Sequence, residues 1–246
     1  MIENQNYKFA IICALLDEAK PFLFFLKNKG TLKILKKTSK ISLFIFSFSK
    51  PLFFLNKKID KLYIYVSGVG KTNASHATSI LINKYNVNFL INVGLVGLAN
   101  KTFDLCIPIF VNKSIYHDVD LTDFNYRIGQ LPNLPQIYKP LNYKTIFTKK
   151  DLDKNFSKYY EGNIATGDQF ITEKSFLKIL TSLNWIDAFD MELASIMQVC
   201  FIEKVKVLAI KFGSDYIGSK DNSKTFIESK TTYLNICPSL INLLFK

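Results

Sequence analysis

The sequence predicts a layered α/β domain with a largely parallel sheet. Three observations support this prediction: apolar runs of strand length, amphipathic stretches of helical period, and the alternation of the two along the chain. With 246 residues, 48% of them hydrophobic, the chain can bury a large core. No repeat, low-complexity segment or linker divides it, so we expect residues 1–246 to form one domain.

Five segments have the composition of buried strands. Residues 8–15 are nearly all apolar, as in a strand covered on both faces, and the run breaks at Asp17 and Glu18, where we expect a helix. The other four strand-like runs are residues 42–49, 62–66, 89–93 and 205–210. These runs predict the sheet.

Apolar residues recur at helical spacing in three further stretches, residues 71–86, 193–201 and 233–244. The first lies between two predicted strands and therefore predicts a strand–helix–strand unit. Residues 116–142, rich in Pro, Asn and Tyr, form the one long stretch without clear periodicity. Long loops of this kind are often functional in compact domains.

The chain is basic, with 32 Lys and Arg against 20 Asp and Glu and a net charge of +12. Such a charge attracts nucleic acid, anionic lipid or acidic polysaccharide. The lysines are spread along the whole chain among abundant Ile, Phe and Asn. This spread favours a solvated surface over a dedicated polyanion site, which stays open as an alternative.

The cysteines predict neither a zinc site nor a disulfide framework. They lie far apart without a C-x-x-C pair, and only two histidines accompany them. The four are Cys13, Cys106, Cys200 and Cys237. Reduced cysteines, and a polar start without a cleavable apolar stretch, predict the cytoplasm. Residues 9–16 are too few to span a bilayer, so no membrane association is expected.

The segment at residues 67–72 (SGVGKT) resembles a phosphate-binding loop but has the wrong spacing. The Walker pattern requires glycine where Tyr65 stands, and a dinucleotide fingerprint requires glycine where Asn73 stands. A tight glycine turn between a strand and a helix remains, in which backbone groups approach a neighbour closely. A structural turn and a ligand loop are both open.

Four polar residues have structural explanations when taken singly. For the adjacent pair His117 and Asp118 a structural role is favoured, because neighbours in sequence rarely orient one another. Glu192 precedes an apolar helix and would complement the helix dipole there. Asp215 follows a buried strand, where it would cap a helix. None of these residues alone establishes an enzyme.

Eight short segments give a stronger indication through their order and spacing. They are residues 11–18 (IICALLDE), 67–71 (SGVGK), 91–94 (INVG), 116–122 (YHDVDLT), 129–132 (GQLP), 166–171 (TGDQFI), 190–192 (DME) and 214–215 (SD). Together they cover nearly the whole chain, which resembles the 5'-methylthioadenosine/S-adenosylhomocysteine nucleosidases within the nucleoside phosphorylase superfamily. YHDVD followed by GQLP favours the nucleosidase branch over the phosphorylases.

The resemblance implies a three-layer α/β/α sandwich with a central twisted mixed sheet. It implies hydrolysis of the N-glycosidic bond of 5'-methylthioadenosine and S-adenosylhomocysteine, and of 5'-deoxyadenosine as a further candidate, to adenine and the corresponding sugar. It also implies no metal or organic cofactor. The expected assembly is a homodimer in which each active site borrows residues from the partner subunit.

The resemblance also implies catalytic roles. Asp215 matches the general acid that protonates the purine at nitrogen 7, and Ser214 matches the neighbour that positions it. Glu18 matches the carboxylate that activates water. Lys211 stands where the family has an arginine that helps to hold this water; lysine keeps the charge but lacks the planar fork of donors.

Substrate contacts are implied in the same way. Glu192 would bind the sugar hydroxyls, Phe170 would stack on adenine and Leu95 replaces a serine beside the reaction centre. The remaining contacts are Met191 at the ribose, the Ile171 backbone at the adenine edge, Val69 at the sulfur substituent, and Phe124, Tyr126 and Pro132 closing the alkylthio pocket of the opposite subunit.

The chemistry requires groups at both ends of one bond. Cleavage leaves positive charge on the sugar and negative charge on the purine, so an acid at the base and a carboxylate holding water answer both demands. Two alternatives stay open. A phosphorylase would need arginine near the sugar, and the only arginine is Arg127. A catalytically weakened nucleosidase-like protein would use its basic surface to bind a polyanion.

Overall fold

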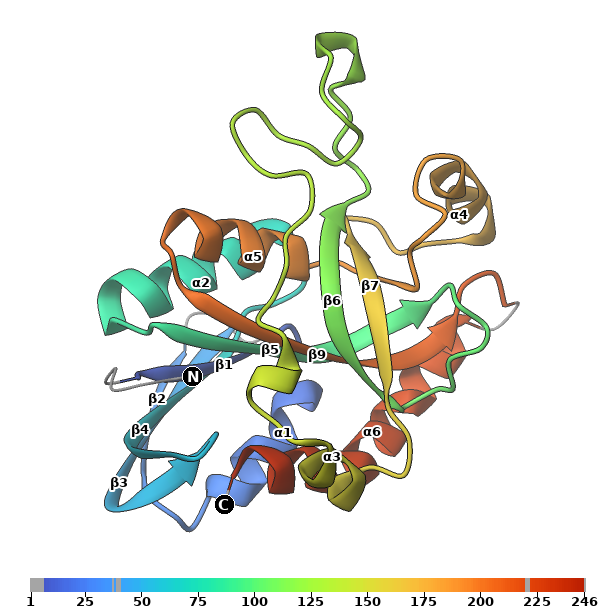
Figure 1. Ribbon diagram of the computed structural model, residues 1–246. Helices are drawn as coiled ribbons and strands as arrows, with labels where there is room; N and C mark the ends of the chain where they lie inside the picture. The colour runs from blue at the N-terminus through green and yellow to red at the C-terminus, as the bar shows by residue number, and fades with distance from the viewer. Residues whose placement is uncertain (1–6, 37, 39–40, 220–221, 246) are drawn as a thin grey trace.

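The computed structural model describes residues 7–36, 38, 41–219 and 222–245 (Figure 1). The polar start at residues 1–6, on which the cytoplasmic prediction partly rests, lies outside these ranges. The described strands are β1 (Phe9–Cys13), β2 (Thr31–Lys36), β3 (Ser42–Phe54), β4 (Lys57–Val66), β5 (Phe89–Leu98), β6 (Pro108–Tyr116), β7 (Tyr160–Thr166), β8 (Ala188–Asp190) and β9 (Lys206–Tyr216). They form one sheet in the order β2-β3-β4-β1-β5-β8-β7-β6-β9.

The sheet is mixed. Five strand pairings are parallel and four are antiparallel. The expectation of a largely parallel sheet from strand–helix alternation is therefore only partly correct, because β2, β3 and β4 follow one another as antiparallel neighbours. The mixed sheet implied by the family resemblance is confirmed. Strand β9 also pairs with β5, so β5, β8, β7, β6 and β9 close into a ring.

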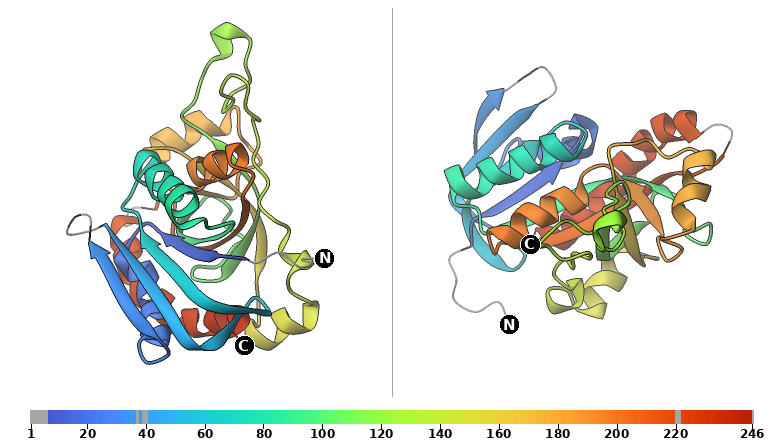
Figure 2. Two further views of the ribbon diagram at one scale, coloured as in Figure 1. Left: turned by 90° about the vertical axis from the view of Figure 1, so that its left-hand side faces the viewer. Right: turned by 90° about the horizontal axis from the view of Figure 1, so that it is seen from above.

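Helices cover both faces of the sheet, which confirms the three-layer α/β/α architecture (Figures 1 and 2). Helices α2 (Lys71–Tyr85) and α5 (Leu193–Ile202) pack together on one face. Helices α1 (Leu16–Leu26) and α6 (Asn222–Leu244) pack together on the other, beside α3 (Lys149–Asn155). Helix α4 (Glu173–Leu180) packs on β8 through the rings of Phe176 and Phe189. None of these helices combines the length and apolar character that crossing a bilayer requires.

The predicted elements are found, and most are longer than predicted, whereas the strand predicted over residues 8–15 is shorter. The helix expected over residues 71–86 ends at Tyr85, and Asn86 follows it with a left-handed φ of 55°, a conformation that asparagine tolerates. Strand β5 continues five residues past Val93, and β9 continues six residues past Ile210, from residue 211 to 216. The family-like segment at residues 91–94, together with Leu95, is therefore part of strand β5. These extensions position the site.

The segment at residues 116–142 projects from the body of the molecule beyond the end of β6 (Figure 1). Its only helical turn within 116–142 is the short η1 (Thr122–Phe124), and a second turn, η2 (Tyr143–Thr145), follows it. At its tip Phe124 is 72% exposed. The expectation of a long loop without periodic structure is confirmed.

Tyr233 connects the two helices that cover one face. Its hydroxyl is buried in α6 and donates a hydrogen bond of 2.9 Å to the backbone carbonyl of Glu18 in α1. The hydroxyl of Tyr65 in β4 is equally buried but has no hydrogen-bond partner among the described residues. The two tyrosines therefore form a matched pair for measuring what a buried hydroxyl contributes.

We expect Tyr233→Phe to lower the free energy of unfolding by about 1–3 kcal/mol, because a buried carbonyl loses its donor. Tyr65→Phe removes a hydroxyl that makes no hydrogen bond to another described residue, so the free energy of unfolding should stay unchanged or rise. Urea unfolding of both variants beside the parent protein measures the difference. Equal destabilisation by the two substitutions would contradict the assigned role of Tyr233.

Candidate active site

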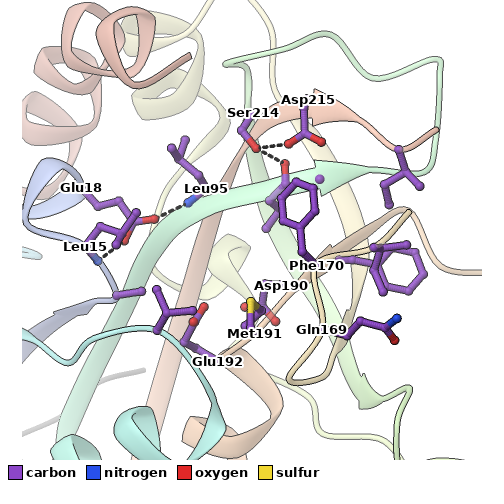
Figure 3. A pocket seen from close by; sticks show the side chains of 17 residues that line it. Leu15, Glu18, Leu95, Gln169, Phe170, Asp190, Met191, Glu192, Ser214 and Asp215 are labelled. Atoms are coloured by element: carbon purple, nitrogen blue, oxygen red, sulfur yellow. Dashed lines mark hydrogen bonds between the residues drawn. The ribbon is translucent and has the colours of Figure 1, made fainter. Parts of the chain in front are cut away.

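A cavity of about 320 Å³ opens where the carboxyl ends of several strands meet the glycine turn before α2. Its lining brings together residues from six separate stretches of the chain (Figure 3). Polar lining groups include Glu18, Glu192, Ser214 and Asp215. The two carboxyl groups on which the nucleosidase interpretation depends, Glu18 and Asp215, therefore face one common cavity.

Glu18 is clamped by the backbone. It lies in the first turn of α1, is 3% exposed, and accepts hydrogen bonds from two amides. Its Oε2 accepts from Leu15 N at 2.8 Å and its Oε1 from Leu95 N at 2.8 Å (Figure 3). Burial raises the pKa of Glu18, and the two amide bonds and Lys211 oppose this rise. The carboxylate thus has a fixed orientation toward the cavity.

Asp215 lies within strand β9, so its structural explanation as a helix cap is wrong. It is 2% exposed and its Oδ1 accepts a 2.6 Å hydrogen bond from the Ser214 hydroxyl, which is also 3.0 Å from the carbonyl of Val96 (Figure 3). Burial raises the pKa of Asp215, while the bond from Ser214 lowers it. A carboxyl group whose pKa is raised keeps a proton that it can donate at higher pH than an ordinary aspartate can.

Glu192 binds the glycine turn. Its Oε1 accepts a 2.9 Å hydrogen bond from the Gly70 amide, and Val69 of the same turn lines the cavity. Gly70 has a φ of 101°, a conformation that glycine adopts without strain. The structure therefore places the turn against the candidate site, which favours the ligand-loop interpretation. Burial and the neighbouring Asp190 raise the pKa of Glu192.

Lys211 is buried and is not one of the residues that line the cavity. It is 1% exposed, and its Nζ lies 2.7 Å from Asp190 Oδ2. Burial alone would lower the pKa of Lys211, but Asp190 and Glu192 outweigh burial and raise it. The ammonium is thus charged and directed at Asp190, whereas the family resemblance implies a contact with water.

Asp190 is the residue of this site to which the sequence assigned no role. Its Oδ1 accepts a 2.6 Å bond from the Thr166 hydroxyl, and its Oδ2 accepts a 3.0 Å bond from the Leu193 amide as well as the ion pair with Lys211. Asp190 therefore fixes the first turn of α5, immediately after Glu192. The signal available in the sequence was a carboxylate directly beside Met191 and Glu192.

The remaining expected contacts divide into two groups. The cavity lining includes Val69, Leu95, Phe170, Ile171 and Met191, as the resemblance implies. Phe124, Tyr126 and Pro132 do not line the cavity of their own chain; they lie on the projecting segment, with Phe124 and Pro132 exposed. Among the described residues, no group of three His, Cys, Asp or Glu side chains is placed to hold a metal ion.

We expect Lys211→Met to lower the free energy of unfolding by about 3–5 kcal/mol, because Asp190 is left as an uncompensated buried charge. The carboxylates that remain take up protons more readily, so the loss should be larger at pH 8 than at pH 5. Denaturant unfolding at both pH values measures it. In the double variant Lys211→Met/Asp190→Asn the loss should be smaller than the sum of the single losses; additive losses would contradict the pairing.

Comparison with known proteins identifies the family. A family model described as the phosphorylase superfamily matches residues 8–244. A 5'-methylthioadenosine/S-adenosylhomocysteine nucleosidase of Buchnera aphidicola from Baizongia pistaciae is 34% identical over 252 residues, covering 99% of this chain and 93% of the relative. The corresponding nucleosidase of Buchnera aphidicola from Acyrthosiphon pisum (strain Tuc7) is 36% identical over 186 residues, covering 70% of this chain and 79% of the relative.

A solved structure of the nucleosidase from Colwellia psychrerythraea, in complex with adenine, is 29% identical and has a TM-score of 0.79. The match covers 98% of this chain and 97% of the Colwellia chain. Because the superfamily match spans nearly the whole chain, and two nucleosidases above 30% identity are covered over most of their length, the chain belongs to the 5'-methylthioadenosine/S-adenosylhomocysteine nucleosidase family of the phosphorylase superfamily.

Proposed function

We propose that this chain hydrolyses the N-glycosidic bond of 5'-methylthioadenosine and S-adenosylhomocysteine, releasing adenine and the thioribose sugar. The observation that carries the proposal is the placement of Glu18 and Asp215 on one cavity of about 320 Å³. The names of the relatives, and the adenine bound to the Colwellia nucleosidase, support the same reaction.

Asp215 serves as the general acid. As the glycosidic bond breaks, negative charge develops on the purine, and a neutral carboxyl group can neutralise it by giving its proton to nitrogen 7. The raised pKa of Asp215 keeps the proton available, and the Ser214 bond to Oδ1 fixes the orientation of the carboxyl group. Oδ2 is the oxygen left to carry the proton toward the base.

Glu18 serves as the base that activates water. Each carboxylate oxygen already accepts one backbone amide bond and keeps a second lone pair, which can accept from a water molecule in the cavity. The attacking water then gives its proton to Glu18 while its oxygen bonds to the anomeric carbon. The products are adenine and the free sugar, and no phosphate takes part.

Glu192 binds the ribose hydroxyls from the floor of the cavity, beside Met191. Hydrogen bonds to these hydroxyls strengthen as the sugar ring flattens, so their binding energy is expressed in the transition state. Phe170 stacks on adenine and the Ile171 backbone reads its edge. Val69 contacts the sulfur substituent, with Leu95 close to the reaction centre; their apolar side chains suit an alkylthio group.

Lys211 contributes indirectly in this proposal. Its ammonium neutralises Asp190, and Asp190 fixes the Leu193 amide next to Glu192. The charge also lowers the pKa of Glu18 and so favours the ionised form that activates water. Lys211 is thus a positioning and electrostatic residue in this chain.

The assembly we propose is a homodimer with shared active sites. Phe124, Tyr126 and Pro132 lie on the projecting segment and do not line their own cavity, which is the arrangement that a contribution to a partner's alkylthio pocket requires. We also propose that residues 1–246 form one catalytic domain, since all nine described strands join one sheet. Four free cysteines are compatible with the reducing cytoplasm, where we place the enzyme.

Replacing Asp215 with Asn should lower the rate of adenine release from 5'-methylthioadenosine by about 10²- to 10⁴-fold, the usual contribution of a general acid. An adenine-release assay with and without phosphate measures it. Asp104→Asn, which alters an exposed carboxylate paired with Lys158, is the control and should keep the parent rate. Undiminished release by Asp215→Asn would remove the acid assignment, and a strict phosphate requirement would indicate a phosphorylase.

The pH dependence of turnover, measured for the parent protein and for Asp215→Asn, tests the same assignment in a second way. Since the pKa of Asp215 is raised, the acid stays protonated above the ordinary range of aspartate, and turnover falls as the pH rises through this pKa. Residual activity of Asp215→Asn should lack this alkaline limb. An unchanged limb would assign the titrating acid to another residue.

Mixing two defective variants tests the shared site. Equal amounts of Asp215→Asn and Phe124→Gly chains, dissociated and reassociated, should recover high-affinity turnover at about a quarter of all sites, because hybrid dimers of two-fold symmetry contain one site free of both defects. The readout is adenine release at low 5'-methylthioadenosine concentration. Without recovery, Phe124 would act on its own chain or not at all.

A further inference from the structure

Three charged residues from the family-like segments have no role in the mechanism above, yet they meet beside the site. Asp118 Oδ2 lies 2.7 Å from Lys71 Nζ and accepts a 2.9 Å hydrogen bond from the Asp168 amide. Asp168 Oδ1 in turn accepts a 2.8 Å bond from the Lys71 amide. The three contacts close a ring, which we call the Asp118 bridge.

Within the Asp118 bridge, the contact between Asp168 and the Lys71 amide fixes the glycine turn. Lys71 is the first residue of α2, and the preceding Gly70 provides no side-chain cap, so the helix begins with unsatisfied amides. Asp168 supplies the missing acceptor and places a negative charge at the helix N-terminus, where the helix dipole favours it. A Cβ at Gly70 would lie 3.1 Å from Asp168 Oδ1, so the contact is close. The Gly70 amide is the donor to Glu192.

The contact between Asp118 and the Asp168 amide fixes the start of residues 167–171, which we call the adenine loop. Asp168 lies two residues before Phe170, and Gly167 donates a 3.2 Å bond to the carbonyl of Asp190. A Cβ at Gly167 would lie 2.3 Å from His117 Nε2 and 2.9 Å from Asp118 Cγ, so only glycine fits under the bridge. The loop that carries Phe170 is therefore held against residues 117 and 118.

We propose that Lys71, Asp118 and Asp168 form a positioning device that holds Glu192 and Phe170 at a fixed separation across the nucleoside. The device rests on the proposed function, since it acts through residues that bind ribose and adenine. It touches no reacting atom, and it explains why an acidic residue follows His117, the first residue after β6, and why a lysine follows the glycine turn.

The first test removes each member of the ring. We expect Lys71→Met and Asp118→Ala each to lower kcat/KM for 5'-methylthioadenosine about fivefold, a modest factor because the ion pair is partly exposed to solvent. The double variant should lose no more of its kcat/KM than either single variant, since one broken contact already disrupts the Asp118 bridge. Lys71→Arg, which keeps the cation, should stay within twofold of the parent.

A second readout separates positioning from mere stability. Since the bridge acts through Glu192, the variants should discriminate less strongly against the 2'-deoxy analogue of the substrate, whereas a loss of stability alone would leave this ratio unchanged. The matched control is Lys144→Met, which breaks an ion pair with Glu161 near the start of β7, the end remote from the bridge. This variant should alter neither kcat/KM nor the discrimination against the 2'-deoxy analogue. Thermal unfolding of every variant identifies any that fails to fold.

Glu192→Gln distinguishes this proposal from the proposed function. If Glu192→Gln lowers kcat/KM and the discrimination ratio while both bridge variants match the parent, the bridge has no positioning role. If Glu192→Gln has no effect, the assignment of the ribose contact is wrong and the bridge proposal fails with it. Parallel loss of discrimination in all three variants supports the proposal.

Discussion

One buried cluster of charges sets the geometry of the candidate site. Lys211 is the cation of this cluster, and Glu18, Asp190 and Glu192 surround it, all at most 7% exposed. Removing such charges from water costs several kcal/mol per ion unless each is paired and hydrogen-bonded. Three segments of the chain, around residues 18, 190–192 and 211, must therefore meet in one arrangement, because the buried ion pair of Lys211 with Asp190 forms only there.

Backbone amides hold the acidic side chains of this cluster in place. Glu18 accepts from the amide of Leu95, and it would do so whatever side chain residue 95 carried. Gly94 leaves room for this contact, since a Cβ there would lie 3.0 Å from Glu18 Oε1. The replacement of the family's serine by leucine at position 95 thus removes a hydroxyl from the cavity but leaves the orientation of Glu18 intact. The glycine beside it is the more constrained position.

Apolar patterning predicts the parts of the fold that bury continuous runs. It fails where polar function interrupts such a run. Strand β9 continues past Ile210 because β6 and β5 both pair with it at Lys211, and β5 accompanies it as far as Tyr216; local composition does not indicate this pairing. Strand β8 has only three residues and depends wholly on tertiary pairing. The ion pair of Lys211 with Asp190 joins residues far apart in sequence. Motif order locates the carboxylates, but the pairing appears only in three dimensions.

The base and the tip of the segment at residues 116–142 have different structural roles. The composition of the segment does not distinguish them. Its base contributes Asp118 to the bridge beside the cavity of its own chain, while its tip carries Phe124 away from that cavity. In the proposed dimer, one continuous segment therefore contacts two active sites. Long loops lose much conformational entropy on ordering, so fixing the base reduces the number of conformations that the tip must give up when it meets a partner. An anchored base and an exposed aromatic side chain at the tip are consistent features of a single docking element.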